Sequence, residues 1–264
     1  MSVRRGYKAV SCGQIHYRYA GAAGAPVLVL LHQTPSSSEM FEPLMLELVR
    51  EFRMIAPDLP GMGMSDPLPG DVSIAGYAKH VAECLDELNV DEAFVFGHHT
   101  GASVAVQLAI DHPEVVAALA LSGPPVLDDA LRKALPEMAK PIAPRADGGH
   151  LGDMWQRISG KDDSAPIEIV QRETISGLRL GEHYPDPYAA VIEHDIDRQL
   201  QMLRIPTVVF AGTGDPLFSQ LQNAADLLKN GSLARIEGAR SFVCETHLDD
   251  VAELLRGFYR REAA

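Results

Sequence analysis

Val95-Phe96-Gly97-His98-His99-Thr100-Gly101-Ala102-Ser103 is the stretch that decides the fold of this chain. The apolar run before Gly97 predicts a buried strand. The apolar residues Ala105, Leu108 and Ala109 follow at helical spacing and predict a helix. The glycine between these two patterns indicates a tight turn. The sequence therefore predicts a strand, a sharp turn and a helix, with His99 at the centre of the turn.

The pattern Gly-x-X-x-Gly between a strand and a helix is typical of a nucleophile elbow. Close packing of the strand against the helix requires small residues there, and the central side chain stands exposed above the sheet. Serine is the usual central residue, whereas this chain has His99. Because a histidine cannot act as a hydroxyl nucleophile, the rest of the chain must show which chemistry the turn supports.

Strands and helices are predicted to alternate on both sides of this turn. Polar and apolar residues alternate at 15–19, which predicts an antiparallel edge. Continuous apolar runs predict parallel strands that are buried on both faces, at residues 27–31, 54–56, 119–121 and 207–211. Helices are predicted at about 41–52, 74–88, 130–138, 154–158, 167–178 and 187–199, then from the loop at 212–217 to about 228, and at 249–259. Residues 126–204 show no continuous strand, so we expect a helical insertion there.

Length and composition limit the alternatives. A chain of 264 residues with 46% hydrophobic content can bury one sizeable core, so we expect a single domain over 1–264. The net charge of -13 argues against nucleic acid and anionic membranes as partners. Three widely spaced cysteines and no apolar leader predict a reduced, cytoplasmic protein. We expect a small-molecule substrate, and the sequence leaves a homodimer open.

Four motifs in order resemble the α/β-hydrolase fold family over essentially the whole chain. His32-Gln33-Thr34-Pro35 is similar to the His-Gly-x-Pro oxyanion loop, and 57–66 resembles the family's Asp-x-Pro-Gly-x-Gly-x-Ser segment. Gly97 to Gly101 matches the elbow, and 212–216 resembles the loop of the catalytic acid, which gives Asp215 that role. The resemblance implies a mostly parallel sheet flanked by helices, with 126–204 as the substrate-selecting cap.

The family's catalytic histidine usually stands in a Gly-x-Gly-His-Phe run before the last helix. The corresponding run here is Gly238-Ala239-Arg240-Ser241-Phe242, so Ser241 occupies the histidine position. His247 lies six residues further on and is kept as an alternative. The resemblance thus implies that serine and histidine have exchanged places. Asp215 is expected beside and behind Ser241, where it would compete for the serine proton instead of orienting His99.

These residues allow three kinds of chemistry. His99 could be the general base for a Ser241 nucleophile, or itself the nucleophile. It could also be the acid or base of a cofactor-free lyase, decarboxylase or isomerase. In each case the Thr100 amide, together with the amide of Thr34 or Gln33, is expected to stabilise an oxyanion. A fourth reading is a binding homologue in which His99 is a remnant of lost catalysis.

The interpretation we favour is a carboxylic ester hydrolase with His99, Ser241 and Asp215 at its centre. Its substrate would be an ester, a lactone or a related acyl compound that is small and mostly apolar. We expect no cofactor and no metal, because no metal-binding spacing supports a cluster of His32, His98, His99 and Asp215. His32 and His98 are predicted to be structural.

Overall fold

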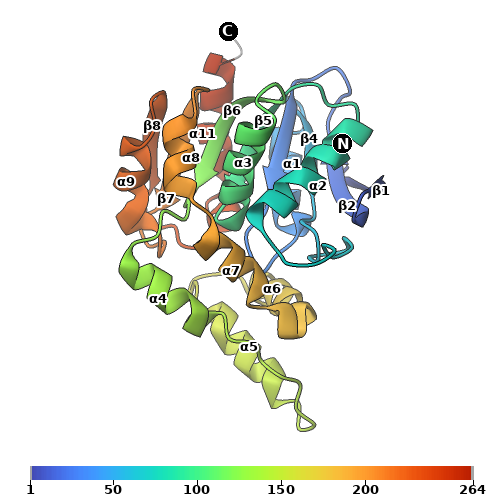
Figure 1. Cartoon of the computed structure of the whole chain (residues 1–264), viewed down its shortest axis with the longest axis vertical. Coiled ribbons are helices and arrows are strands. Elements are labelled where there is room, and N and C mark those ends of the chain that lie inside the picture. The colour runs from blue at the N-terminus through green and yellow to red at the C-terminus, as the bar shows by residue number, and fades with distance from the viewer. Residues whose placement is uncertain (1, 263–264) are drawn as a thin grey trace.

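The computed structural model describes residues 2–262, which form one eight-stranded sheet with helices on both faces (Figure 1). The strands are β1 (Arg4–Val10), β2 (Gly13–Ala20), β3 (Val27–Leu31), β4 (Arg53–Pro57), β5 (Ala93–His98), β6 (Val116–Ser122), β7 (Thr207–Gly212) and β8 (Gly231–Ile236). The helices are α1 (Glu42–Leu48), α2 (Ile74–Glu87), α3 (Thr100–Asp111), α4 (Asp129–Met138), α5 (Gly149–Ser159), α6 (Ile167–Leu180), α7 (Asp186–Glu193), α8 (Ile196–Met202), α9 (Leu221–Asp226), α10 (Val243–Thr246) and α11 (Leu248–Glu262).

The sheet has the order β1-β2-β4-β3-β5-β6-β7-β8. β1 pairs antiparallel with β2, and β2 antiparallel with β4, while all other pairs are parallel. The antiparallel edge predicted from alternation near the N-terminus is therefore confirmed. So are the central parallel strands, whose continuous apolar sequence reflects burial on both faces.

Alternate side chains of the central strands supply two separate hydrophobic layers. Val29 and Val95 pack under α2, α3 and α8, whereas Leu30 and Phe96 pack under α1 and α11 on the opposite face. Because the parallel strands all end at the same edge, the loops after β3, β5, β6 and β7 come together there. This edge carries the predicted site residues.

Residues 123–206 contain helices and loops and no strand. The predicted cap, 126–204, includes α4 to α8. Figure 1 shows α4 and α5 projecting beyond the end of the sheet, with α5 outermost. α8 instead packs on α3, and its residues Ile196 and Leu200 belong to the main core. Within the described residues, no helix is long and apolar enough to cross a membrane.

One helix prediction was wrong, and one short helix was missed. The single helix expected over 187–199 is two helices, α7 and α8, because His194 is extended at the end of α7. The Asp195 side chain then accepts a hydrogen bond from the Arg198 amide and begins α8. An aspartate inside an amphipathic pattern can cap a new helix as well as continue the old one. The missed helix is α10, a single turn directly after Ser241.

Candidate active site

His99 lies in a sharp turn between β5 and α3, with backbone angles φ 49° and ψ -111°. A non-glycine residue in this region carries strain of roughly 1 to 3 kcal/mol. The two flanking glycines allow it: a Cβ on Gly97 would collide with the Gly101 carbonyl, and a Cβ on Gly101 with the Leu31 carbonyl. The close contact between α3 and the strands thus forces the central residue outward, as the elbow pattern predicts.

The His99 imidazole contacts Asp215 directly. Its Nε2 lies 2.8 Å from Asp215 Oδ2, while the other carboxylate oxygen accepts a hydrogen bond of 2.8 Å from the Leu217 amide. Burial would raise the pKa of Asp215, but the His99 charge, its hydrogen bond and the Leu217 amide together hold that pKa below its usual value. Asp215 is therefore an ionised acceptor, and His99 donates its Nε2 proton to it.

This contact corrects the expected position of Asp215. We expected Asp215 to compete for the serine proton instead of orienting His99. The prediction that it would not orient His99 was wrong. His99 and Asp215 both lie at the carboxyl edge of the sheet, after β5 and β7, and the imidazole is long enough to span the gap between the two loops. With Nε2 engaged, a neutral His99 keeps its lone pair on Nδ1, which has no hydrogen-bond partner within residues 2–262.

Gly123 provides the space for the His99 ring, a role that was not predicted from the sequence. A Cβ on Gly123 would lie 2.5 Å from His99 Cδ2 and 2.7 Å from its Nε2. Its backbone angle φ of +53° also favours glycine. The only signal in the sequence was a glycine directly after the buried strand β6. Gly123 fixes the plane in which the imidazole meets Asp215.

His98 is a buried neutral bridge beneath this pair. Its ring stacks on the His99 ring with centroids 4.1 Å apart, and its Nε2 donates to the Ser241 carbonyl at 3.0 Å. Nδ1 must then accept from the Ser122 hydroxyl, also at 3.0 Å. Burial, aided by the His99 charge, lowers the pKa of His98 to about 3. The structural role predicted for His98 is confirmed, since it joins the elbow to the loop that carries Ser241.

Ser241 lies on the same cavity as His99. Its side chain is buried, and its hydroxyl makes no hydrogen bond within the described part of the chain, to His99 or to any other residue. His247 is half-buried, bonds to the Thr246 hydroxyl through Nδ1 and is not part of the cavity wall. The structure therefore brings Ser241, and not His247, to the cavity that His99 faces.

This cavity has a volume of about 710 Å³ and lies between the carboxyl edge of the sheet and the helices α4, α5 and α7. Most of its wall is apolar, and it is large enough for a small organic molecule. The apolar lining comes from Pro125, Leu127, Leu131, Leu135, Met138, Val191, Pro216 and Leu217, with Tyr184 and Tyr188 beside them. The polar groups His99, Gln33, Thr34, Thr100 and Ser241 line the same space.

The predicted oxyanion residues share this wall. Thr100 is the first residue of α3, where no preceding turn offers a carbonyl to its amide. The buried ring of His32 holds the loop of Gln33: its Nδ1 donates to the Gln33 carbonyl at 2.8 Å, and its Nε2 accepts from the Leu59 amide at 2.9 Å. The structural role predicted for His32 is thereby confirmed. The Gln33 side chain makes no hydrogen bond within residues 2–262 and so can contact a ligand.

The donor set for a metal is not present in the described chain. No group of three or more His, Cys, Asp or Glu side chains in residues 2–262 could hold a metal ion. Both ring nitrogens of His32 and His98 are used in the hydrogen bonds given above.

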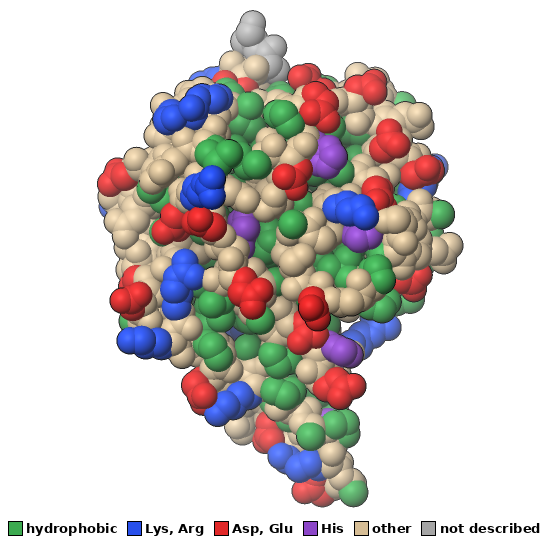
Figure 2. Space-filling model, in the orientation of Figure 1, with side chains coloured by type: hydrophobic (Ala, Val, Ile, Leu, Met, Phe, Trp, Pro, Cys, Tyr) green, Lys and Arg blue, Asp and Glu red, His purple; other side chains and the backbone are tan. Residues whose placement is uncertain are grey.

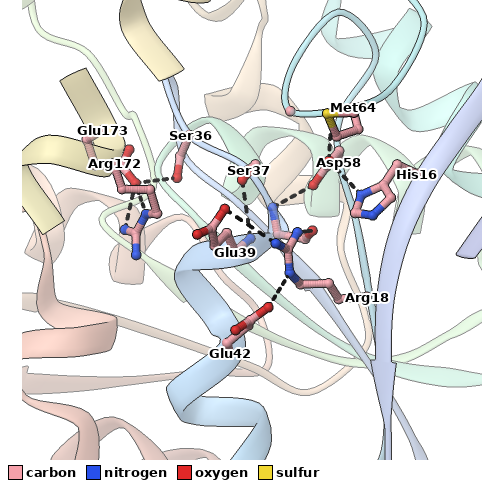
Figure 3. A network of polar contacts seen from close by, with 12 residues as sticks. His16, Arg18, Ser36, Ser37, Glu39, Glu42, Asp58, Met64, Arg172 and Glu173 are labelled. Carbon is pink, nitrogen blue, oxygen red and sulfur yellow. Dashed lines mark hydrogen bonds and ion pairs between the residues drawn. The ribbon is translucent and has the colours of Figure 1, made fainter. Parts of the chain in front are cut away.

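A buried ionic network joins the insertion to two loops of the site, and Figure 3 shows the part formed by Ser36, Arg172 and Glu173. Arg172 of α6 donates to its neighbour Glu173 at 2.6 Å and, with two nitrogens, to Glu245 of α10 at 2.6 and 2.7 Å. Glu173 also accepts from Ser36 at 3.0 Å. Burial raises the pKa of Glu173, although the Arg172 charge opposes this. The network links α6 to the loop after Thr34 and to the turn after Ser241.

A second buried contact fixes the loop after β4. Asp58 accepts from His16 at 2.8 Å and from the Ser38 amide at 2.7 Å, as Figure 3 shows. Burial opposes ionisation, but these donors lower the pKa of Asp58 to about 2. The resulting carboxylate holds together β2, the loop after Pro35 and the turn at Met64. This explains why an acidic residue stands at this position of the fold without facing the cavity.

Comparisons with known proteins agree with this architecture. A family model described as the alpha/beta hydrolase fold matches residues 26–165, more than half of the chain. An uncharacterized hydrolase of Saccharomyces cerevisiae is 26% identical and covers 91% of each chain. The (E)-2-((N-methylformamido)methylene)succinate hydrolase of Acinetobacter baylyi is 24% identical over 92% of this chain and 93% of that protein. An enol-lactonase structure from Burkholderia xenovorans superposes with a TM-score of 0.79 at 20% identity, over 97% of this chain and 100% of that one. The chain belongs to the α/β-hydrolase fold family.

Proposed function

We propose that this protein hydrolyses an ester, lactone or related acyl bond of a small, mostly apolar carbonyl compound. The observation that carries the proposal is the 2.8 Å contact between His99 Nε2 and the buried carboxylate of Asp215. A carboxylate in this position fixes the tautomer and the plane of an imidazole and stabilises its protonated form. His99 is thus the general base, although it stands where the family has its nucleophile.

The base acts through Nδ1. This atom accepts a proton from the nucleophile as the nucleophile attacks the substrate carbonyl carbon. The carbonyl oxygen becomes an oxyanion, held by the amides of Thr100 and of Gln33 or Thr34. When the tetrahedral intermediate collapses, the bond to the leaving oxygen breaks and the protonated His99 returns the proton to that oxygen. The partly exposed ring, at 16% of its side-chain surface, meets the substrate without leaving Asp215.

The nucleophile is either the Ser241 hydroxyl or a water molecule. Ser241 lines the same cavity as His99, and its backbone is held by His98, which stacks on His99. The hydroxyl makes no hydrogen bond to His99 within the described residues, so attack by water needs no rearrangement of the chain. A serine nucleophile would form an acyl-enzyme intermediate, which a water molecule activated by His99 would then cleave to release the acid, whereas direct attack by water forms no such intermediate.

The experiment is ester and lactone hydrolysis by the parent protein, His99→Ala and Ser241→Ala, together with labelling by a fluorophosphonate. The proposal expects turnover by the parent and a loss in His99→Ala of about 100-fold or more. Labelling at Ser241 that disappears in His99→Ala assigns a serine nucleophile. No labelling, with activity retained in Ser241→Ala, assigns water. The proposal fails if neither the parent protein nor the double exchange His99→Ser with Ser241→His hydrolyses any acyl substrate.

A second function is favoured by the same unoccupied Nδ1. A base with no hydroxyl bonded to it, facing a mostly apolar cavity, can remove a proton directly from a substrate that forms an enolate. This describes a cofactor-free lyase or isomerase. In a decarboxylase the C–C bond to the departing CO2 would break instead, and a protonated His99 would supply the proton to the enolate. Proton exchange with deuterated solvent at a carbon next to the carbonyl, lost in His99→Ala, would distinguish it from ester hydrolysis.

A further inference from the structure

The cavity wall gathers positive side chains although the protein is strongly acidic. Arg157, Lys161 and Arg240 all line it, against Glu137 as the carboxylate in the wall. Glu137 is itself mostly exposed and forms an exposed ion pair with Lys140, so the cavity wall carries three cations against one carboxylate. In a chain of 36 acidic and 23 basic residues, three cations around one mostly apolar cavity are a local reversal of the overall charge.

Two of these cations have no acidic partner. Among the residues 2–262, neither Arg157 nor Lys161 forms an ion pair with a carboxylate. Arg240 meets only Asp163, at 3.5 Å, and Asp163 is 80% exposed. An exposed pair of this kind contributes little and is readily replaced by another anion. The cavity therefore offers charge that the protein itself does not use.

Two contacts orient the Arg157 guanidinium. Its guanidinium lies 5.1 Å from the centre of the Tyr184 ring, and its Nη1 donates to the Lys140 carbonyl. Tyr184 stacks on Tyr188, whose hydroxyl donates to the Thr34 carbonyl at 3.2 Å. The tyrosine pair thus forms a continuous wall from the oxyanion loop to Arg157. A guanidinium fixed in this way loses little conformational freedom on binding a carboxylate.

Arg240 lies on the loop that carries Ser241, and through Asp163 it contacts the segment that follows α5. A Cβ on Gly214 would lie 2.9 Å from Arg240 Cγ, so the glycine before Asp215 leaves room for the arginine stem. The loop of Ser241 therefore carries one cation, Arg240, while α5 and the residues directly after it carry the other two, Arg157 and Lys161.

We infer that the substrate carries an anionic group, a carboxylate, which Arg157 and Lys161 bind while the apolar cavity holds the chain between it and the scissile carbonyl. At physiological salt, charges further than about 8 Å away are largely screened, so the distant acidic surface does not outweigh these nearby cations. The stacked tyrosines lie between the oxyanion loop and Arg157. The substrate therefore needs several carbons between its scissile carbonyl and the carboxylate that Arg157 binds. This inference rests on the proposed function for its reacting group.

The test compares 4-nitrophenyl hemiesters of succinate, adipate and suberate with their methyl-capped neutral counterparts. We expect the hemiesters of longer chain to have the higher kcat/KM, and Arg157→Gln to raise their KM at least 10-fold. The neutral esters should change less than 2-fold. Lys161→Gln should act in the same direction. Lys229→Gln, an exposed lysine before β8, is the matched control and should change neither substrate.

Binding of suberate to His99→Ala, measured by calorimetry, separates this inference from the proposed function. The double variant His99→Ala with Arg157→Gln should bind suberate at least 10-fold more weakly than His99→Ala does, and added salt should weaken binding to His99→Ala. Both results support the anion site even where no ester is hydrolysed. Equal turnover of anionic and neutral esters overturns the inference while leaving the hydrolase intact. Suberate binding that does not depend on either Arg157 or Lys161 overturns it as well.

Discussion

His99 Nε2 and Asp215 Oδ2 lie 2.8 Å apart, although the two residues are separated by 116 positions in the chain. Asp215, on the loop that resembles the family's catalytic-acid loop in sequence, thus contacts an imidazole that projects from the elbow itself. We expect Asp215→Asn to lower kcat/KM for an acyl substrate by about 100- to 10,000-fold, because the tautomer and the charge that stabilises protonated His99 are both lost. Steady-state kinetics measure this change.

Two further variants show whether Asp215 acts through His99. If it does, the double variant with His99→Ala should be no slower than His99→Ala alone, since residues that act as a unit are not additive. Asp226→Asn, an exposed carboxylate on α9, is the control and should leave the rate unchanged. Independent losses that multiply in the double variant would contradict the pairing.

Gly123→Ala should displace the His99 ring. The new methyl group would lie 2.5 Å from Cδ2 of His99, in addition to the strain of a φ of +53°. Gly181→Ala is a matched control, because Gly181 has a φ of +55° and no heavy atom within 4 Å of its ideal Cβ. Both variants should lose about 1 kcal/mol of unfolding free energy from backbone strain. Only Gly123→Ala should also lose activity to the level of His99→Ala, as kinetics and denaturant unfolding of the same samples would reveal.

The sequence was sufficient where local patterns determine the structure. The apolar run at 27–31 forms β3 with the predicted bounds, and the glycines around His99 produce the predicted turn. The sequence was insufficient where a side chain can contact more than one residue from distant loops. The contact of His99 with Asp215 depends on the reach of the imidazole and on the space at Gly123, and neither follows from the spacing of residues. The break at Asp195 was missed for a similar reason, because capping competes with helix continuation at the same residue.

The stability of the protein should fall as the pH drops below about 6.5, because two buried histidines must remain neutral. Burial lowers the pKa of both His32 and His98, and that of His98 to about 3. As the pH falls, each histidine is protonated in the unfolded chain before it is protonated in the folded protein. The full contribution of each neutral histidine to the unfolding free energy is therefore present above its unfolded pKa and is lost as the pH falls towards its pKa in the folded protein. At about pH 5, His98 alone should cost about 2 kcal/mol.

Urea unfolding between pH 7 and pH 5 measures this dependence. His98→Gln keeps a donor for the Ser241 carbonyl and removes the titrating group, so its stability should change less over this interval. His183→Gln replaces an exposed histidine and should leave the slope as it is in the parent. A slope that is the same in the parent and in His98→Gln would refute the assignment.

Arg172→Leu should destabilise the protein strongly, because it leaves two buried carboxylates without their shared cation. Glu173 and Glu245 have side chains that are only 1% and 6% exposed. Removing one partner from a buried ion pair typically costs 3 to 5 kcal/mol, so we expect a loss of about 3 kcal/mol in unfolding free energy. Arg145→Leu tests an exposed pair of equal length with Asp153, each side chain being 47% exposed, and should cost less than about 1 kcal/mol.

The triple variant Arg172→Leu, Glu173→Gln, Glu245→Gln should recover part of the loss, because the uncompensated charges are gone. A triple variant no more stable than Arg172→Leu would mean that the network contributes packing and not charge pairing.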